Sequence, residues 1–151
     1  MKFKNKKFAY QTFANHLYTY ICNDLAKNYP SRNLILIPIP MHFYAKWNRG
    51  YNQTESLCKE IIKYDKLETF IYIPNVIKKI KFTKSQKHLD NKDQRLQNLK
   101  DSFYIKNKSV VSGKIVVVID DVWTTGATLH EITKILKQSG AEKVFCYAIA
   151  H

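Results

Sequence analysis

The chain has 151 residues, of which 45% are hydrophobic, and a formal net charge of +13. This length suits one domain over residues 1–151, and the charge favours polyanionic partners, although a lysine-rich composition alone gives the same excess. No apolar run approaches the roughly 20 residues of a membrane span, and the basic N-terminus lacks a signal peptide's apolar stretch, so we expect a cytoplasmic protein without membrane insertion.

In chain order, the first half of the sequence is predicted to contain a helix over residues 8–27, a central strand over 34–37, a loop over 41–50 and a helix from Asn52 to about Tyr64. The first helix is predicted from apolar residues that recur every three or four positions. Asn52 and Glu55 are suited to capping the second helix. A strand, a loop and a helix in this order form the first half of a βαβ unit.

The second half is predicted to contain strands over 69–73, 76–80 and 101–106, a flexible polar loop around 81–100, a helix over 127–139 that Gly140 ends, and a last strand over 144–150. Long polar insertions in compact domains are usually functional or disordered. Alternating strands and helices predict an α/β fold with three layers, in which helices flank a mostly parallel central sheet.

The stretch from Val116 to Leu129 is the most informative part of the sequence. Four apolar residues, 116–119, predict a buried parallel strand, and Asp120 and Asp121 follow immediately. We therefore expect the two acids just past the carboxyl end of this strand. Open α/β sheets bind their ligands at that edge.

A short Thr/Gly loop, 124–126, separates the acids from the next helix. Thr128 and Glu131 fit a capping box, and the free N–H groups of a helix start attract anions. This combination predicts a phosphate site. Asp120 and Asp121 would repel phosphate, so they suit sugar hydroxyls or a Mg²⁺ ion. A phosphorylated sugar is the ligand that fits both features.

This stretch resembles the PRPP-binding motif of the type I phosphoribosyltransferases. The resemblance implies that Asp120 and Asp121 hold the ribose hydroxyls. It further implies that the 5′-phosphate is held by Thr124, Thr125, Gly126, Ala127 and Thr128.

Further blocks resemble the ComF family, phosphoribosyltransferase-like proteins linked to DNA uptake in natural competence. The blocks are P-I-P-M-H at 38–42, R-G-Y-N-Q at 49–53, K-K-I-K-F-T-K-S-Q-K-H-L at 78–89, R-L-Q-N-L-K-D-S-F at 95–103 and the motif at 116–129. ComF proteins usually begin with a four-cysteine, zinc-ribbon-like segment. This sequence has three scattered cysteines and no such segment, so no zinc is expected in this chain.

The resemblance implies PRPP, or a phosphoribosyl nucleotide, as ligand, with Mg²⁺ on Asp120 and Asp121. Arg49 and Arg95 are the expected catalytic partners of these acids, since arginine forms the planar fork that suits phosphates. Further candidates for the pyrophosphate side are His42, Lys81, Lys84 and Gln86. For the lysines, a solvated face is the more common role.

Two kinds of function are compatible with the sequence. In the first, the chain binds PRPP and handles single-stranded DNA with other competence proteins, and Trp47, Tyr51 and Trp123 are candidates for stacking on bases. Core packing is the more common fate of such aromatic residues, whereas for Trp123 the two roles are equally favoured. In the second, the chain is a nucleobase salvage phosphoribosyltransferase that transfers ribose 5-phosphate to a purine or pyrimidine.

Overall fold

The computed structural model of the protein describes residues 2–26, 28–29, 33–41, 47, 50–80, 99, 101–123 and 126–150. Side chains are described from residue 11 onward within these ranges, except that of residue 26. Most of the loop predicted at 81–100 therefore lies outside the described residues. Within them, no helix combines the length and apolar character that crossing a membrane requires.

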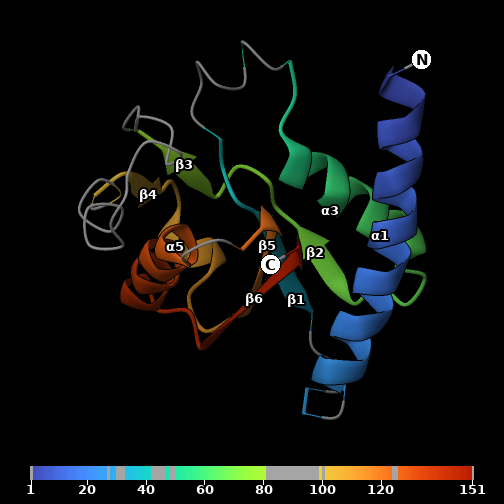
Figure 1. The fold of residues 1–151 in the computed structure, drawn as a ribbon. Helices are drawn as coiled ribbons and strands as arrows, with labels where there is room; N and C mark the ends of the chain where they lie inside the picture. The colour runs from blue at the N-terminus through green and yellow to red at the C-terminus, as the bar shows by residue number, and fades with distance from the viewer. Residues whose placement is uncertain are drawn as a thin grey trace.

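A parallel sheet of four strands forms the centre of the molecule, in the order β2-β1-β5-β6 (Figure 1). Its strands are β1 (Leu34–Pro38), β2 (Phe70–Tyr72), β5 (Ile115–Val122) and β6 (Lys143–Ala150). Ile35 of β1 lies opposite Ile71 of β2 on one side and Val116 of β5 on the other, which fixes the register of these three strands. The parallel βαβ unit predicted from the first half of the sequence is confirmed by this pairing.

Two short strands form a separate antiparallel pair. They are β3 (Ile77–Lys79) and β4 (Phe103–Ile105), and a 3₁₀ turn, η2 (Lys108–Val110), follows β4. Both strands were predicted, but the sequence did not indicate that they would pair with each other instead of joining the central sheet. Phe103 and Ile77 are buried, so this pair contributes to the core on its side of the sheet.

The helices cover both faces of the central sheet (Figure 1). They are α1 (Lys2–Ala26), α3 (Gln53–Tyr64) and α5 (Ala127–Gln138). Helices α1 and α3 pack on one face, and α5 packs on the other beside β3 and β4. The three-layer α/β architecture predicted from the sequence is confirmed. The first helix begins earlier than predicted because its lysine-rich start favours helix without showing an apolar period.

Alternate residues of the inner strands belong to two different cores. Leu36 and Val117 pack with α1 and α3, whereas Ile37 and Val118 pack with α5 and the small sheet. All of these side chains are fully buried. A strand buried on both faces reads as a continuous apolar run, which is why β1 and β5 were the most readily predicted strands.

Candidate functional site

Asp120 and Asp121 lie on β5 itself, not just past its end as the sequence predicted. The strand continues to Val122 because β6 runs alongside it, with Asp120 opposite Ala148 and Val122 opposite Ala150. The other neighbour, β1, ends sooner: its last pair joins Pro38 to Ile119. The two acids therefore extend beyond β1 while β6 still supports them, and they remain at the carboxyl edge of the sheet, where α/β folds bind ligands.

The carboxyl group of Asp120 lies in a partly desolvated environment. Its pKa is raised from 3.8 to about 7, chiefly by burial and in part by the adjacent side chain of Asp121, against the opposing effect of backbone hydrogen bonds. One of these bonds is donated by the Asp121 N–H to Oδ1 of Asp120 over 2.8 Å. A carboxylate that is costly to charge is stabilised by a cation or by hydroxyl donors, so this position is suited to a ligand that supplies them.

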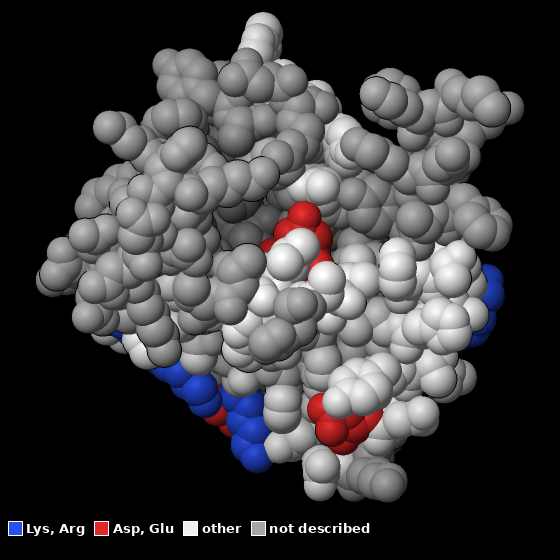
Figure 2. Space-filling view, viewed as in Figure 1, with Lys and Arg blue, Asp and Glu red and all other residues white. Residues whose placement is uncertain are grey.

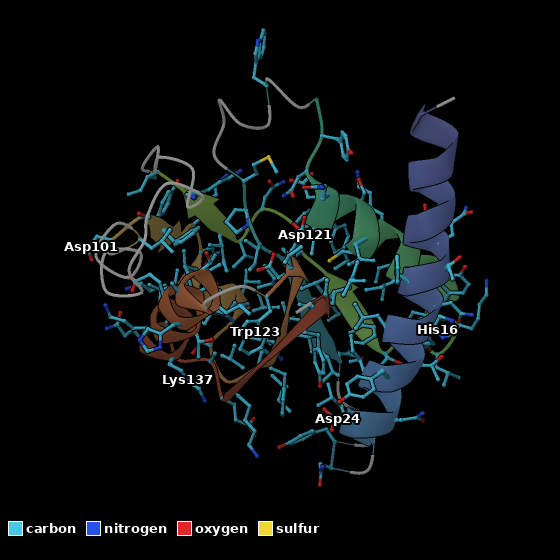
Figure 3. All side chains as sticks on the ribbon, in the orientation of Figure 1. His16, Asp24, Asp101, Asp121, Trp123 and Lys137 are labelled. Atoms are coloured by element: carbon cyan, nitrogen blue, oxygen red, sulfur yellow. The ribbon has the colours of Figure 1, made fainter. Side chains whose placement is uncertain are left out.

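The acids reach the surface of the molecule. Figure 3 labels Asp121 near the centre of the view, at the top of β5. At the same place in Figure 2, acidic side chains are visible at the surface. This position leaves the carboxylates open to a ligand from outside, and they are not part of either apolar core.

The helix after the acids begins at the predicted position, but the predicted capping box does not form. Gly126 is the N-cap residue, with φ of 71° in the left-handed region, and α5 starts at Ala127 without a side-chain cap. The capping box of Thr128 and Glu131 was wrong because glycine already makes the turn and Thr128 lies inside the helix. Glu131 accepts a hydrogen bond from the Asp101 N–H instead. Helix N–H groups attract phosphate at a start of this kind, where the N-cap residue Gly126 has no side chain.

Trp123 forms part of the same corner. Its N–H donates to the carbonyl of Ala150 over 2.8 Å, which anchors the residue at the end of the β5–β6 pair. Its indole lies against Gly126, where an added Cβ would come within 3.1 Å of Nε1. The side chain remains 38% exposed. The side chain of Trp123 is therefore only partly buried. The residue directly precedes the loop predicted to hold phosphate.

A buried polar network joins the start of α3 to the same edge. Asn52 donates from Nδ2 to the carbonyl of Ile39, and the Thr54 hydroxyl donates to the same oxygen over 2.8 Å. The N–H of Ile39 in turn donates to the carbonyl of Ile119, the residue before Asp120. Asn52 was predicted as a helix cap, and this is confirmed. Its hydrogen bond to the residue after β1 was not predicted. The sequence signal for that link was the polar N-x-T pattern that follows the apolar strand and the loop.

The other candidate residues divide into two groups. Trp47 is 77% exposed, so core packing was the wrong expectation for it, and Tyr51 is half-buried next to Asn52. Eight predicted polar partners and loop threonines lie outside the described residues, namely His42, Arg49, Lys81, Lys84, Gln86, Arg95, Thr124 and Thr125. Their roles stay predictions.

The acidic pair is chemically suited to Mg²⁺. Among the described residues, no group of three or more histidine, cysteine or acidic side chains is placed to hold a metal alone. Mg²⁺, however, is usually held by one or two carboxylates together with phosphate oxygens of the substrate. The side chains of Asp120 and Asp121 fit that pattern, and the described cysteines are free thiols rather than parts of a metal cluster.

Comparison with known proteins identifies the family. Residues 65–151 match the phosphoribosyl transferase domain family. The chain is 32% identical over 150 residues to competence protein F of Haemophilus influenzae, covering 99% of this chain and 64% of the relative. It is 31% identical over 109 residues to DNA utilization protein YhgH of Salmonella typhi, covering 72% and 45%. The chain thus spans about half to two thirds of these relatives' lengths.

The solved structures agree on the fold. A hypoxanthine phosphoribosyl transferase of Trypanosoma cruzi superposes with a TM-score of 0.57 at 11% identity, covering 95% of this chain and 74% of that one. At such low identity the likeness concerns the fold alone. Together with the family match and the relatives above, it confirms the resemblance drawn from the sequence: the chain belongs to the phosphoribosyl transferase domain family and is a ComF-type member of it.

Proposed function

We propose that this chain binds PRPP, or a related phosphoribosyl compound, together with Mg²⁺, and that it acts in the handling of single-stranded DNA during natural transformation. One observation carries the ligand: Asp120 and Asp121 lie at the same edge of the sheet as the start of α5 at Gly126. Carboxylates suit ribose hydroxyls, and the N–H groups at a helix start suit a phosphate. A phosphorylated sugar satisfies both.

The roles of the individual residues follow from this placement. Asp120 and Asp121 would hold the ribose hydroxyls or the metal, and Mg²⁺, when bound, would offset the charge of the pyrophosphate group. The first N–H groups of α5, from Gly126 to Thr128, would hold the 5′-phosphate with the hydroxyls of Thr124 and Thr125. Binding a ligand in this way would also offset the desolvation of Asp120.

The residues proposed for the pyrophosphate side come from the sequence. Arg49 and Arg95 would balance the charge that develops as pyrophosphate leaves, with His42, Lys81, Lys84 and Gln86 as further contacts. If the chain catalyses transfer from PRPP, these side chains would stabilise an oxocarbenium-like transition state from which water must be excluded.

The DNA-related part of the proposal draws on charge and on the relatives. The net charge of +13 attracts a polyanion, and two relatives are named a competence protein and a DNA utilization protein. The strongly exposed Trp47 and the partly exposed Trp123 supply aromatic surface on which bases could stack. Other competence proteins are proposed partners in the same process.

A second candidate function is nucleobase salvage. Trp123 favours it, because an indole that is 38% exposed beside the acidic pair offers a stacking surface for a purine or pyrimidine. In this case the chain would transfer the ribose 5-phosphate of PRPP to a free base. Nucleotide formation from PRPP and one of the common bases would establish this function.

Calorimetric titration with three ligands tests the proposal. PRPP should bind with Mg²⁺ and more weakly in EDTA, ribose 5-phosphate should bind more weakly because it lacks the pyrophosphate, and free ribose should not bind measurably. Equal binding of PRPP and free ribose would contradict a phosphate site. Incubation of PRPP with each common base, followed by chromatography, then separates binding alone from salvage.

A further inference from the structure

Lysines gather at the edge of the central sheet opposite Asp120 and Asp121. Segments 106–114 and 137–143 flank the starts of β5 and β6, and Glu142 is the sole acid in the two segments. Of the five exposed lysines in these segments, Lys106 directly follows β4. The other four are here called the lysine platform. They are Lys108, Lys114, Lys137 and Lys143.

The two segments form one continuous surface. The N–H of Gly113 donates to the carbonyl of Gly140 over 2.8 Å, and the N–H of Glu142 donates to that of Lys114 over 2.9 Å. The contact is close, because a Cβ added to Gly140 would lie 3.0 Å from the hydroxyl of Ser112. Lysines that are far apart in sequence are therefore held on one rigid support.

The platform lysines outnumber the acids beside them, because Glu142 is the one acid in the two segments against four platform lysines. Nζ of Lys137 donates to the backbone carbonyl of Glu142 over 3.0 Å. Nζ of Lys143 donates to the hydroxyl of Tyr29 and lies 4.9 Å from the centre of that ring. Both acceptors are neutral. The Lys63–Glu60 and Lys134–Glu131 ion pairs lie outside the platform.

The platform is remote from the candidate phosphoribosyl site. Lys114 precedes Asp120 by six positions on or next to β5, which corresponds to about 20 Å along an extended strand. Figure 3 labels Lys137 well away from Asp121, and Figure 2 shows basic side chains along that lower edge of the molecule. A ligand on the platform would not compete directly with a small ligand bound at Asp120 and Asp121.

From this arrangement we infer that the lysine platform binds the phosphate backbone of single-stranded nucleic acid. Lysines in excess of acids on a fixed support match a chain of regularly spaced phosphates. A lipid surface is disfavoured, because membrane-bound elements pair lysines with exposed apolar side chains. The large exposed apolar side chains of the described residues all lie outside the two segments.

The inference rests on the DNA-handling part of the proposed function and assigns it a surface. It separates the protein into two ends, with a phosphoribosyl ligand at the carboxyl edge of the sheet and nucleic acid at the amino edge. Binding at the two ends should therefore be independent to a first approximation. Saturating PRPP should leave the affinity for single-stranded DNA unchanged within about twofold, unlike two ligands that share one site.

Fluorescence anisotropy with a labelled 20-nucleotide single strand, measured over a range of salt concentrations, tests the platform. The variant Lys108→Gln/Lys114→Gln/Lys137→Gln/Lys143→Gln should bind about tenfold or more weakly at low salt. The slope of log affinity against log salt should flatten by about 3, since each lost phosphate contact on a single strand removes about 0.7. The double variant Lys108→Gln/Lys114→Gln, which leaves the Tyr29 contact intact, should show about half of this change in slope.

A matched control removes the same charge elsewhere. Lys59→Gln/Lys63→Gln/Lys66→Gln/Lys78→Gln changes two lysines of α3, one in the turn after it and one in β3. Circular dichroism verifies that each variant is folded. Equal losses in both quadruple variants would overturn the platform in favour of diffuse attraction. Undiminished DNA binding in the platform variant would also overturn it while leaving DNA handling intact. Tight binding of the wild type to anionic vesicles but not to DNA would replace the nucleic-acid partner with a membrane.

Discussion

Trp123 lies directly against Gly126, so close that a Cβ on the glycine would meet the indole Nε1 at 3.1 Å. Gly126 also has φ of 71°, a conformation that side chains disfavour. Two constraints, one from backbone conformation and one from an aromatic neighbour, thus meet at the residue where α5 begins. This corner shapes the loop proposed to hold the 5′-phosphate.

The variant Gly126→Ala should expose both constraints. The left-handed conformation alone costs roughly 1–2 kcal/mol for a residue with a side chain, and the indole must shift by a few tenths of an ångström besides. Gly113→Ala is the matched control, because Gly113 has φ of 66° and open space around its Cβ position. Urea unfolding should show the larger loss for Gly126→Ala, and calorimetry should show weaker PRPP binding in that variant alone. Equal losses and undisturbed binding would contradict the role of this corner.

Trp123 should report ligand binding by fluorescence. The chain has two tryptophans, and Trp47→Phe leaves Trp123 as the sole emitter. Because the partly exposed indole borders the proposed phosphate loop, PRPP with Mg²⁺ should change its emission intensity or wavelength in a saturable manner. The control is Trp123→Phe, in which Trp47 reports from the loop before α3. A saturable signal from Trp47 with none from Trp123 would move the ligand away from α5.

Asp120 should make folding stability depend on pH in a specific direction. Burial raises its pKa in the folded state from 3.8 to about 7, so the folded protein favours the neutral carboxyl group. The stabilisation of that form is present at low pH and is lost as pH rises from about 4 through 7, where the buried group must become charged. Asp120→Asn should therefore be more stable than the wild type at pH 8, by roughly 1–3 kcal/mol after allowance for partial solvent access.

Urea unfolding of wild type and Asp120→Asn between pH 4 and pH 8, in EDTA, measures this difference. The advantage of asparagine should grow from pH 4 to pH 7 and level off above. A difference that is constant with pH would show that the carboxyl group is not desolvated in the folded state.

Asn52 should matter more for stability than an ordinary helix cap. It is 4% exposed, its Oδ1 accepts from the Thr54 N–H and its Nδ2 donates to the Ile39 carbonyl. Asn52→Ala removes both bonds and should cost about 2–3 kcal/mol. Asn107, an exposed residue whose Oδ1 caps η2, provides the comparison, since Asn107→Ala should cost about 1 kcal/mol or less. Similar losses in thermal unfolding would show that the link from Asn52 to β1 contributes little.

The sequence predicted the architecture more completely than the site. Strands such as β1 and β5 were evident because both faces are buried and their residues form unbroken apolar runs. The extension of β5 past Asp120 was not evident, because a polar residue can continue a strand when its neighbour supplies the backbone hydrogen bonds. That support comes from β6, and pairing between strands is a tertiary property.

Within the site, the sequence predicted where the helix after the acids begins, but it did not predict the contacts between residues from different elements. The helix start just after Gly126 was predicted correctly, but the capping box of Thr128 and Glu131 on which it rested was wrong, because Gly126 makes the turn. The indole packed on Gly126 and the hydrogen bonds from Asn52 to Ile39 depend on how the chain folds back on itself. Neither contact follows from residue spacing, which reports on neighbours in sequence only.

The central claim is that the two adjacent acids of β5 help to bind a phosphoribosyl ligand. The most direct measurement is calorimetric titration of PRPP with Mg²⁺ into the wild type and into Asp120→Asn/Asp121→Asn, with circular dichroism to verify the fold. Saturable binding to the wild type and at least a tenfold loss in the double variant are expected, since hydrogen bonds to charged groups contribute about 1.5–3 kcal/mol. Equal binding by the two proteins, or no binding by the wild type, would contradict the claim.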